Sequence, residues 1–162
     1  MIAQACGVPR DGLLQAYVGQ GATYTDCFEV MSPRAVSLPE LIEAFYTTWL
    51  FRLERSVLSM FLRRRVRDSD VHALAQGGDN FAVWQVEARG ETQILLKERT
   101  GHTRSFLAVL GEEGGGTRLI FGSAVVAQEG KPLGPLIRAL TPLHQLYSKC
   151  LIRLAERKLR FT

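Results

Sequence analysis

The sequence predicts an α+β fold in which a curved antiparallel β-sheet wraps around one long C-terminal helix. Three observations predict it: an early strand followed by a helical region, a run of five apolar segments separated by turn residues, and a final amphipathic stretch. Strands joined by short turns pair as antiparallel neighbours, and the last helix must then cover the apolar face of the sheet. We expect the space between helix and sheet to hold a small apolar molecule.

The chain has 162 residues, which suits one domain with one hydrophobic core. We expect this domain to span residues 23–162. Residues 1–22 are rich in glycine and are expected to be a loosely ordered lead-in. Residues 1–20 lack the charged start, apolar stretch and cleavage site of a secretion signal, so we expect them to be retained.

Charge and hydropathy narrow the range of partners. The 20 lysines and arginines against 16 acidic residues give a net charge of +4, which is too mild for a dedicated nucleic-acid binder, so no nucleic-acid partner is expected. The longest apolar region, 38–62, is interrupted by five charged residues. Burying these charges in a bilayer would cost kilocalories each, so no stable membrane insertion is expected.

Cysteine and histidine spacing also bears on chemistry. Cys6, Cys27 and Cys150 are odd in number and far apart in sequence, so neither a disulfide framework nor a CxxC site is expected. This cysteine usage favours a reduced, cytoplasmic setting. The three histidines are separated by about thirty residues or more without neighbouring ligands, and we predict no metal site.

The first elements follow from alternation and capping. Residues Thr23–Val30 alternate between apolar and polar side chains, as a half-buried strand does. The segment Ser37–Glu40 matches a capping box, which starts a helix. The apolar residues that follow recur at helical spacing with one shift of phase, so they predict two short helices, or one bent helix, ending near Arg65.

The middle of the chain reads as a meander of five strands. Glycine-containing turns separate its apolar segments, which are Val71–Ala75, Phe81–Ala88, Thr92–Glu98, Thr103–Leu110 and Thr117–Ala127. After Pro135, apolar residues keep helical spacing from Leu136 to Leu154. This stretch is the predicted closing helix.

Turn lengths predict which side chains face inward. If Arg89-Gly90 and Thr100-Gly101 are two-residue loops, one mostly apolar side of the sheet carries Phe81, Val83, Gln85, Ile94, Leu96, Glu98, Thr103, Ser105, Leu107 and Val109. The other side then carries Trp84, Val86, Arg89, Gln93, Leu95, Lys97, Arg104 and Phe106. A slip of one residue at either turn would invert the assignment. A weaker hypothesis is that an exposed face with Trp84 and Phe106 mediates homodimerisation or docking to another protein.

The element order resembles the helix-grip superfamily, which includes START lipid-transfer domains, birch-pollen-allergen-like proteins and polyketide cyclases. Within it, the segments Ile94–His102 and Leu140–Tyr147 look like an uncharacterised bacterial branch of unknown function. The resemblance covers residues Tyr24 to Leu159, although Thr100 stands where relatives usually carry proline. It implies a deep apolar cavity between sheet and long helix, often with no cofactor.

The candidate ligand-binding residues combine the predicted inward face with the closing helix. They are Phe81, Val83, Gln85, Leu96, Glu98, Ser105, Leu107, Phe121, Leu140, His144 and Tyr147. Catalytic candidates are His144, Tyr147 and Glu98, because imidazole, phenol and a buried carboxyl can each transfer a proton. No nucleotide-binding, nucleophile-elbow or metalloprotease motif accompanies them.

Each candidate also has a structural interpretation. His144 and Tyr147 are also consistent with packed, hydrogen-bonded core residues, and this interpretation is preferred because no nucleophile or carboxylate partner is fixed by the sequence. Glu98 suits a hydrated position near a turn, paired with Arg99 or Arg104. The arginine run 63–65 with Arg67 suits a solvated helix C-terminus better than a phosphate site.

Two functions remain open at this point. The first is a module that binds a small hydrophobic molecule, lipid-like or aromatic, between the sheet and the C-terminal helix, without a cofactor. The second is a cofactor-free enzyme of the cyclase or dehydratase type, in which His144, Tyr147 or Glu98 moves a proton. The binding module is slightly preferred, because no catalytic constellation is fixed by the sequence.

Overall fold

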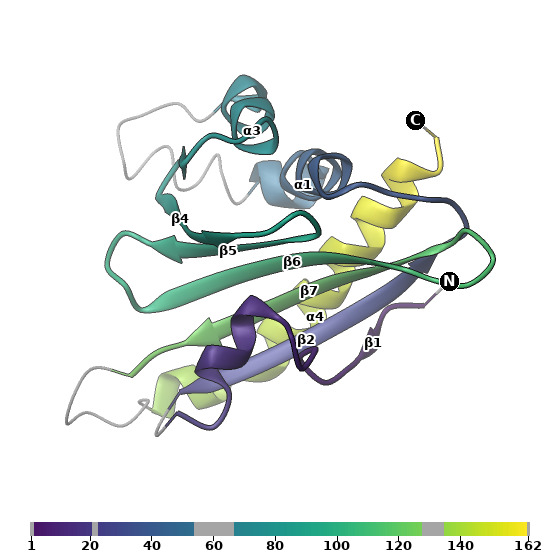
Figure 1. Ribbon diagram of the computed structural model, residues 1–162. Helices are drawn as coiled ribbons and strands as arrows, with labels where there is room; N and C mark the ends of the chain where they lie inside the picture. Colours follow the sequence, from purple (N-terminus) through teal and green to yellow (C-terminus); the bar gives the residue numbers. More distant parts are fainter. Residues whose placement is uncertain (1, 21–22, 54–66, 128–134, 162) are drawn as a thin grey trace.

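The computed structural model describes residues 2–20, 23–53, 67–127 and 135–161 (Figure 1). The elements before the meander are β1 (Gln4–Ala5), the 3-10 helix η1 (Leu13–Tyr17), β2 (Tyr24–Ser32), α1 (Leu38–Tyr46) and α3 (Asp68–Ala75). The later elements are β3 (Asn80–Phe81), β4 (Trp84–Arg89), β5 (Gln93–Glu98), β6 (Thr103–Gly111), β7 (Thr117–Val125) and α4 (Pro135–Leu159). Residues 49–53 are also helical.

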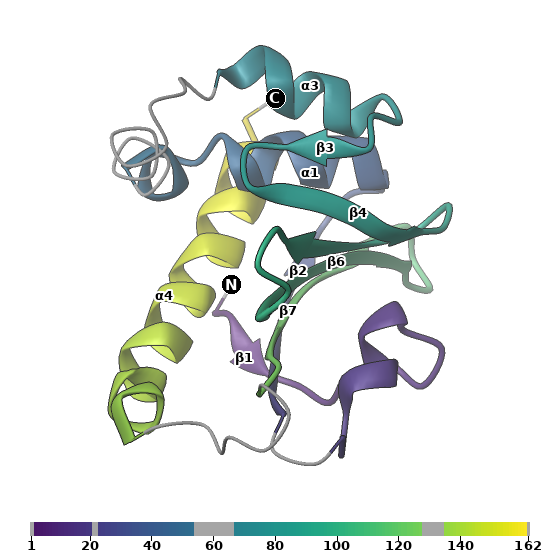
Figure 2. The ribbon, with the colours of Figure 1, turned by 90° about the vertical axis from the view of Figure 1, so that its left-hand side faces the viewer.

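All strands belong to one seven-stranded antiparallel sheet with the order β1-β2-β7-β6-β5-β4-β3. Helices α1 and α4 pack on one face, here called the inner face, and η1 packs on the opposite, outer face. Figure 2 shows the sheet curving beside α4. This arrangement confirms the predicted α+β helix-grip fold, with the C-terminal helix gripped by the sheet.

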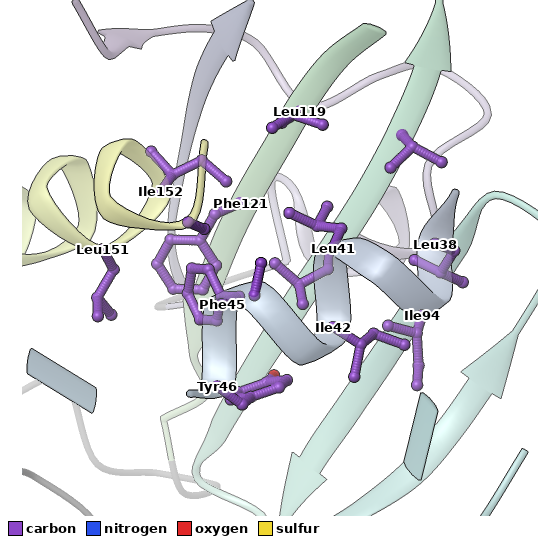
Figure 3. Close-up of a cluster of buried hydrophobic side chains, with 14 of the residues drawn as sticks. Leu38, Leu41, Ile42, Phe45, Tyr46, Ile94, Leu119, Phe121, Leu151 and Ile152 are labelled. Carbon is purple, nitrogen blue, oxygen red and sulfur yellow. The ribbon is translucent and has the colours of Figure 1, made fainter. Parts of the chain in front are cut away.

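Helix α1 begins where the capping box predicts. The carboxylate of Glu40 accepts a hydrogen bond from the Ser37 backbone N–H at 2.7 Å, and the Glu40 backbone N–H donates to Ser37 Oγ at 3.5 Å. The apolar side of α1 is then buried against the inner face (Figure 3), through Leu38, Leu41, Ile42, Phe45 and Tyr46. Here local capping and burial of one helix face specify the same element.

The predicted strand Val71–Ala75 is wrong: these residues form the C-terminal part of α3. A five-residue apolar run fits either a strand or a buried helix turn, and here Val71, Leu74 and Ala75 are buried at helical spacing. Upstream, Asp70 Oδ2 accepts the backbone N–H of Arg67 at 2.8 Å. Gly77, with φ of 106°, ends the helix instead of opening a hairpin.

The predicted strand Phe81–Ala88 is interrupted by a tight turn at residues 82–83, so that Phe81 pairs with Trp84. A β-bulge at Glu87 then shifts the register, because Val86 pairs with Leu96 but Ala88 pairs with Leu95. One extra residue reverses the alternation along the first half of β4.

The inward assignment is consequently wrong for β4. Trp84 and Val86 face the inner core, whereas Gln85 is exposed and pairs with Lys97. Arg89 is also on the inner side, where its Nη2 donates to the carbonyls of Leu74 and Gly78, both at 2.9 Å. Arg89 thereby adds a side-chain donor to backbone carbonyls at and just after the end of α3.

The assignment is confirmed for β5 and β6. Ile94 pairs with Leu107, Leu96 with Ser105, and Lys97 with Arg104, which is the register that a two-residue loop at Thr100-Gly101 requires. The strands are joined by residues 99–102, where the Gly101 backbone N–H donates to the Glu98 carbonyl at 2.8 Å and Gly101 has a φ of 79°, which glycine adopts without strain. The inner face of these strands carries Ile94, Leu96, Leu107 and Val109, all buried.

The N-terminal segment covers the outer face, contrary to the expected loose lead-in. Gln4 and Ala5 pair with β2, and Leu14 of η1 is fully buried. Phe106, expected on an exposed docking face, is also fully buried and packs in the same cluster as Leu14. Since Trp84 faces the inner core, the homodimer remains a prediction that rests on neither residue.

The remaining predictions concern the first strand, the helices and membrane insertion. Strand β2 and helix α4 confirm the predicted first strand and closing helix. The end of the second predicted helix and the arginine run 63–65 lie outside the described residues. Within the described ranges, no helix combines the length and the apolar character needed to cross a bilayer.

Candidate functional site

A cavity of about 220 Å³ lies between α4 and the inner face of the sheet. Its walls are mostly aromatic or aliphatic, and they come from α1, the helical residues 49–53, the sheet and α4. The lining residues are Phe45, Phe51, Trp84, Thr103, Arg104, Ser105, Phe121, Ser123, Ala124, Val125, His144, Tyr147 and Leu151. A mainly apolar hollow with a few polar groups is the usual form of a small-molecule site.

The apolar end of the cavity is built on aromatic side chains in tilted and edge-to-face contact. The rings of Phe45 and Phe121 lie 4.7 Å apart between centroids, so α1 and β7 meet there (Figure 3). The ring centroids of Phe51 and Tyr46 lie 4.9 Å apart. Such contacts stabilise each pair beyond area burial and hold the wall in one conformation.

Polar side chains cross the inner face in one row. Asp26 of β2 pairs with Ser123 of β7, which in turn pairs with Ser105 of β6. All three side chains are on the inner face, because they alternate with outer residues such as Cys27 and Ala124. The row therefore places hydroxyl and carboxylate groups beside a mainly apolar cavity.

His144 of α4 completes a cluster with two members of that row. Ser123 Oγ donates to Asp26 Oδ1 at 2.6 Å, and His144 Nε2 lies 2.9 Å from Ser123 Oγ and 3.4 Å from Asp26 Oδ2. Because the serine proton is directed to the carboxylate, Nε2 must carry the proton in the contact with Ser123. The imidazole is thus a donor here.

This geometry differs from that of an activated serine. In a nucleophilic Ser–His pair the imidazole accepts the serine proton, and a carboxylate binds the other ring nitrogen. Here the carboxylate and the hydroxyl both lie near Nε2 of His144. The cluster is suited to donating a hydrogen bond or a proton from the imidazole, not to generating a serine nucleophile.

The Asp26 carboxylate, with its side chain 7% exposed, is well supplied with donors. The phenol of Tyr24 donates to Asp26 Oδ2 at 3.0 Å, and Gln145 Nε2 of α4 donates to that phenol oxygen at 3.1 Å. Burial raises the pKa of Tyr24, and the nearby Asp26 charge raises it further. Tyr24 therefore stays protonated near neutral pH and remains a donor to Asp26.

Ser105 has its own partner from α1. Its hydroxyl lies 3.0 Å from the phenol oxygen of Tyr46, and both residues are buried. The phenol contact fixes the Ser105 side chain at the cavity wall and satisfies two buried hydroxyls at once. The polar row is thus held from α1 at one end and from α4 at the other.

The structure brings four of the predicted ligand-binding residues together at the cavity: Ser105, Phe121, His144 and Tyr147. The other seven lie elsewhere. Phe81, Leu96 and Leu107 are buried in the main core, Val83 belongs to the turn before β4, and Gln85 points outward because of the β4 bulge. Leu140 is 50% exposed on α4.

Glu98 does not lie at the cavity. Its carboxylate accepts hydrogen bonds from the backbone N–H of Thr100, at 3.0 Å, and from the Thr100 hydroxyl. Glu98 therefore lies near a turn, as its structural interpretation predicted. Its hydrogen-bond partner is Thr100, however, in place of the predicted Arg99 or Arg104. Arg104 instead pairs with the bulged Glu87 at 2.8 Å.

Sequence reasoning missed Asp26 and Ser123, which surround His144. Apolar side chains alternate along the sequences of β2 and β7, and this alternation places both residues on the same face of the strand as the core side chains. An aspartate at a strand position that faces the core indicates a polar partner nearby, because burying an unpaired carboxylate is costly. The sequence could not show which histidine supplies it, because α4 lies far away in the chain.

A second hollow of about 270 Å³ lies among α1, α3 and α4. Its walls carry many charged groups, and these groups form pairs such as Arg34 with Glu40 and Glu43 with His72. Charged walls suit an apolar ligand poorly. Among the described residues, no group of three histidine, cysteine or acidic side chains could hold a metal ion.

Comparison with known proteins yields a likeness of fold only. No family model matches the chain, and no curated protein matches it. The structure is similar to the crystal structure of Ara h 8.0201, with a TM-score of 0.43 and 10% sequence identity over 86% of this chain and 99% of that chain. At this identity and TM-score the likeness has no bearing on what either protein binds.

Proposed function

We propose that this protein binds a small hydrophobic molecule, aromatic or lipid-like, in the cavity between the sheet and α4. The observation that carries the proposal is the hollow of about 220 Å³ with aromatic walls and one polar row. Ser105, Phe121, His144 and Tyr147 are the proposed ligand contacts that the sequence also nominated. Trp84, Val125 and Leu151 join them from the structure.

The cavity volume narrows the ligand. A dry cavity of about 150 Å³ lined by Leu, Ile and Phe holds one benzene molecule. The present cavity is somewhat larger, so it suits a single aromatic ring with a short substituent. A long acyl chain would have to extend beyond the walls, which favours the aromatic class over the lipid-like class.

Apolar burial alone gives modest affinity. Removing about 150 Å² of apolar ligand surface from water contributes about 4 kcal/mol at about 25 cal/mol per Å², which corresponds to a Kd of about 1 mM. Tighter binding requires a polar contact as well. The imidazole of His144 is the cavity side chain best placed to supply one, because it lines the cavity and its side chain is 38% exposed.

Two substitutions test the site directly. Val125→Phe adds a ring at the cavity wall, while Val126→Phe adds the same ring one residue further, outside the cavity lining. We expect ligand-observed NMR with indole to show binding by the wild type and the Val126→Phe variant, and at least a tenfold loss for Val125→Phe. Equal binding by both variants would refute this site. Decanoate in place of indole tests the lipid-like class.

Native mass spectrometry of freshly purified protein addresses the natural ligand. A co-purifying small molecule that is absent from Val125→Phe protein and present on Val126→Phe protein would support the proposal. A molecule retained equally by both variants would place its site elsewhere. The matched pair separates loss of the site from loss of the fold, provided that both variants keep the wild-type circular dichroism spectrum.

The alternative is a cofactor-free enzyme of the cyclase or dehydratase type. The observation that favours it is the position of His144 Nε2, which carries a proton at the cavity between Ser123 and Asp26. Tyr147 lines the same cavity and is a second proton-transfer candidate, whereas Glu98 lies at a turn away from it. His144→Ala distinguishes the two functions: an enzyme loses turnover while keeping its ligand, and a carrier shows only a modest change in affinity.

A further inference from the structure

Two of the three cysteines lie side by side across the N-terminal edge of the sheet, although they are distant in sequence. The pairing of Gln4 with Glu29 and of Ala5 with Phe28 continues by one residue to place Cys6 opposite Cys27. The Cys6 backbone N–H donates to the Cys27 carbonyl at 3.0 Å, which confirms that register. Sequence spacing did not indicate this neighbourhood.

The two thiols share a face of the sheet. Side chains directly opposite each other on antiparallel strands point the same way. Cys27 is buried in the outer cluster that contains Leu14 and Phe106, and the half-buried Cys6 packs against that cluster. Both sulfur atoms therefore lie on the outer face, one covered and one within reach of solvent.

The pairing register of Cys6 and Cys27 is compatible with a disulfide. A hydrogen-bonded antiparallel pair has its Cα atoms about 5.5 Å apart. Disulfides form when the Cα separation is about 4.4–6.8 Å. The pair can therefore close with side-chain rotation and little backbone movement.

The two thiols also differ in reactivity. Hydrogen bonding from the Cys27 thiol lowers the pKa of Cys6, and this effect outweighs burial and the Glu29 charge, which both raise it. The contact with Cys6, followed by burial, raises the pKa of Cys27. Cys6 is thus the accessible, more easily ionised thiol, and Cys27 the protonated neighbour, which is the division of roles between an attacking and a resolving cysteine.

We propose that Cys6 and Cys27 form a reversible disulfide modification site that responds to peroxides. The Cys6 thiolate attacks one peroxide oxygen, the O–O bond breaks, and a sulfenic acid forms as hydroxide or alkoxide leaves. The Cys27 sulfur then attacks the Cys6 sulfur, the S–O bond breaks, and the hydroxyl leaves with the Cys27 proton as water. Two thiols are oxidised and one peroxide is reduced.

The disulfide would tie β1 to β2 and close the segment that carries η1. Closing a loop of this size restricts the unfolded chain, and the expected effect is a rise in Tm of roughly 5–10 °C. The N-terminal cover of the outer face would then be held covalently under oxidising conditions. A reductant such as dithiothreitol returns both thiols and the lower Tm.

The experiment uses the full chain, folded, treated with hydrogen peroxide, quenched and alkylated under denaturing conditions. We expect intact mass spectrometry to show one alkylated thiol after oxidation against three before it, and peptide mapping to show a Cys6–Cys27 link. Cys150→Ser protein, which lacks the exposed third cysteine, should still form the link. Cys6→Ser and Cys27→Ser should each abolish it.

Oxidation in denaturing urea is the second measurement. The folded chain should form the Cys6–Cys27 link at least tenfold faster than the unfolded chain, because the sheet holds the thiols together. Equal rates in both states would overturn the proposal. So would a folded protein in which Cys6 is over-oxidised to sulfinic acid without cross-linking, or in which Cys150 provides the main intermolecular product.

Discussion

Gly122 of β7 lies directly beneath the side chain of Leu14: a Cβ atom built on Gly122 would stand 2.6 Å from Leu14 Cδ2 and 3.2 Å from the Asp26 carbonyl oxygen. Leu14 is fully buried in this contact, together with Phe106 on the adjacent strand. The absence of a side chain at Gly122 is what lets η1 approach the outer face. The N-terminal segment is thus part of the packed structure.

Substitution of Gly122 by alanine should destabilise the protein by about 1–3 kcal/mol, because the added methyl overpacks the outer cluster. Urea unfolding monitored by circular dichroism measures the loss. In a Leu14→Ala background the same substitution should cost at least about 1 kcal/mol less, since the clashing methyl is gone. Equal costs in both backgrounds would contradict the packing of Leu14 on Gly122.

Arg104 links the N-terminal segment to the bulge of β4. Its Nε lies 2.8 Å from Glu87 Oε2 and donates to the Tyr17 phenol oxygen at 2.9 Å, and its guanidinium stacks over the Tyr17 ring. Arg104→Ala should destabilise the protein by about 2 kcal/mol in thermal or urea unfolding. The exposed Arg99, changed to alanine, serves as the control and should have an effect within about 0.5 kcal/mol.

The capping box of α1 makes a pH-dependent contribution. Ser37→Ala should cost about 1 kcal/mol at neutral pH, because one helix N–H group loses its acceptor. Hydrogen bonds from Ser37, aided by Arg34, lower the pKa of Glu40 below its ordinary value of 4.5. A lowered folded pKa contributes stability above the unfolded pKa and loses it as the pH falls through the folded pKa.

Unfolding of the wild type and of Glu40→Gln at several pH values checks the sign. The stability difference between them should be constant above about pH 6 and should shrink toward about pH 3. A difference that grows on acidification would be inconsistent with the capping role of the Glu40 carboxylate.

The hydroxyl pair of Tyr46 and Ser105 is expected to stabilise the wall of the cavity. Tyr46→Phe should cost about 1 kcal/mol in urea unfolding, because it leaves a buried serine hydroxyl with one partner fewer. The double-mutant cycle with Ser105→Ala should give a coupling energy of about 0.5–1.5 kcal/mol. Strictly additive effects would show that the two hydroxyls contribute independently.

Local features of the fold were predictable where short-range chemistry decided them. The capping box at Ser37 placed the start of α1, and the turn at Thr100-Gly101 set the register between β5 and β6. The five-residue run Val71–Ala75 was ambiguous because a strand and one buried helical turn need the same composition. No local sequence pattern indicated the bulge at Glu87, which turns Gln85 to the face opposite the predicted one.

The candidate site was predictable only in part. His144, Tyr147, Ser105 and Phe121 followed from helix spacing and strand alternation, and the cavity includes all four. The partners of His144 did not follow, because Asp26 and Ser123 reach it through strand pairings that join distant segments.

By itself the sequence determined the first strand, the start of α1, the register between β5 and β6 and the closing helix, because these depend on periodicity, capping and turn residues within about ten positions of one another. Tertiary structure alone decided that Asp26 meets His144 and that Cys6 meets Cys27. Such contacts depend on how sheet register and helix packing bring remote residues together, and the free energy of that arrangement is a property of the whole chain.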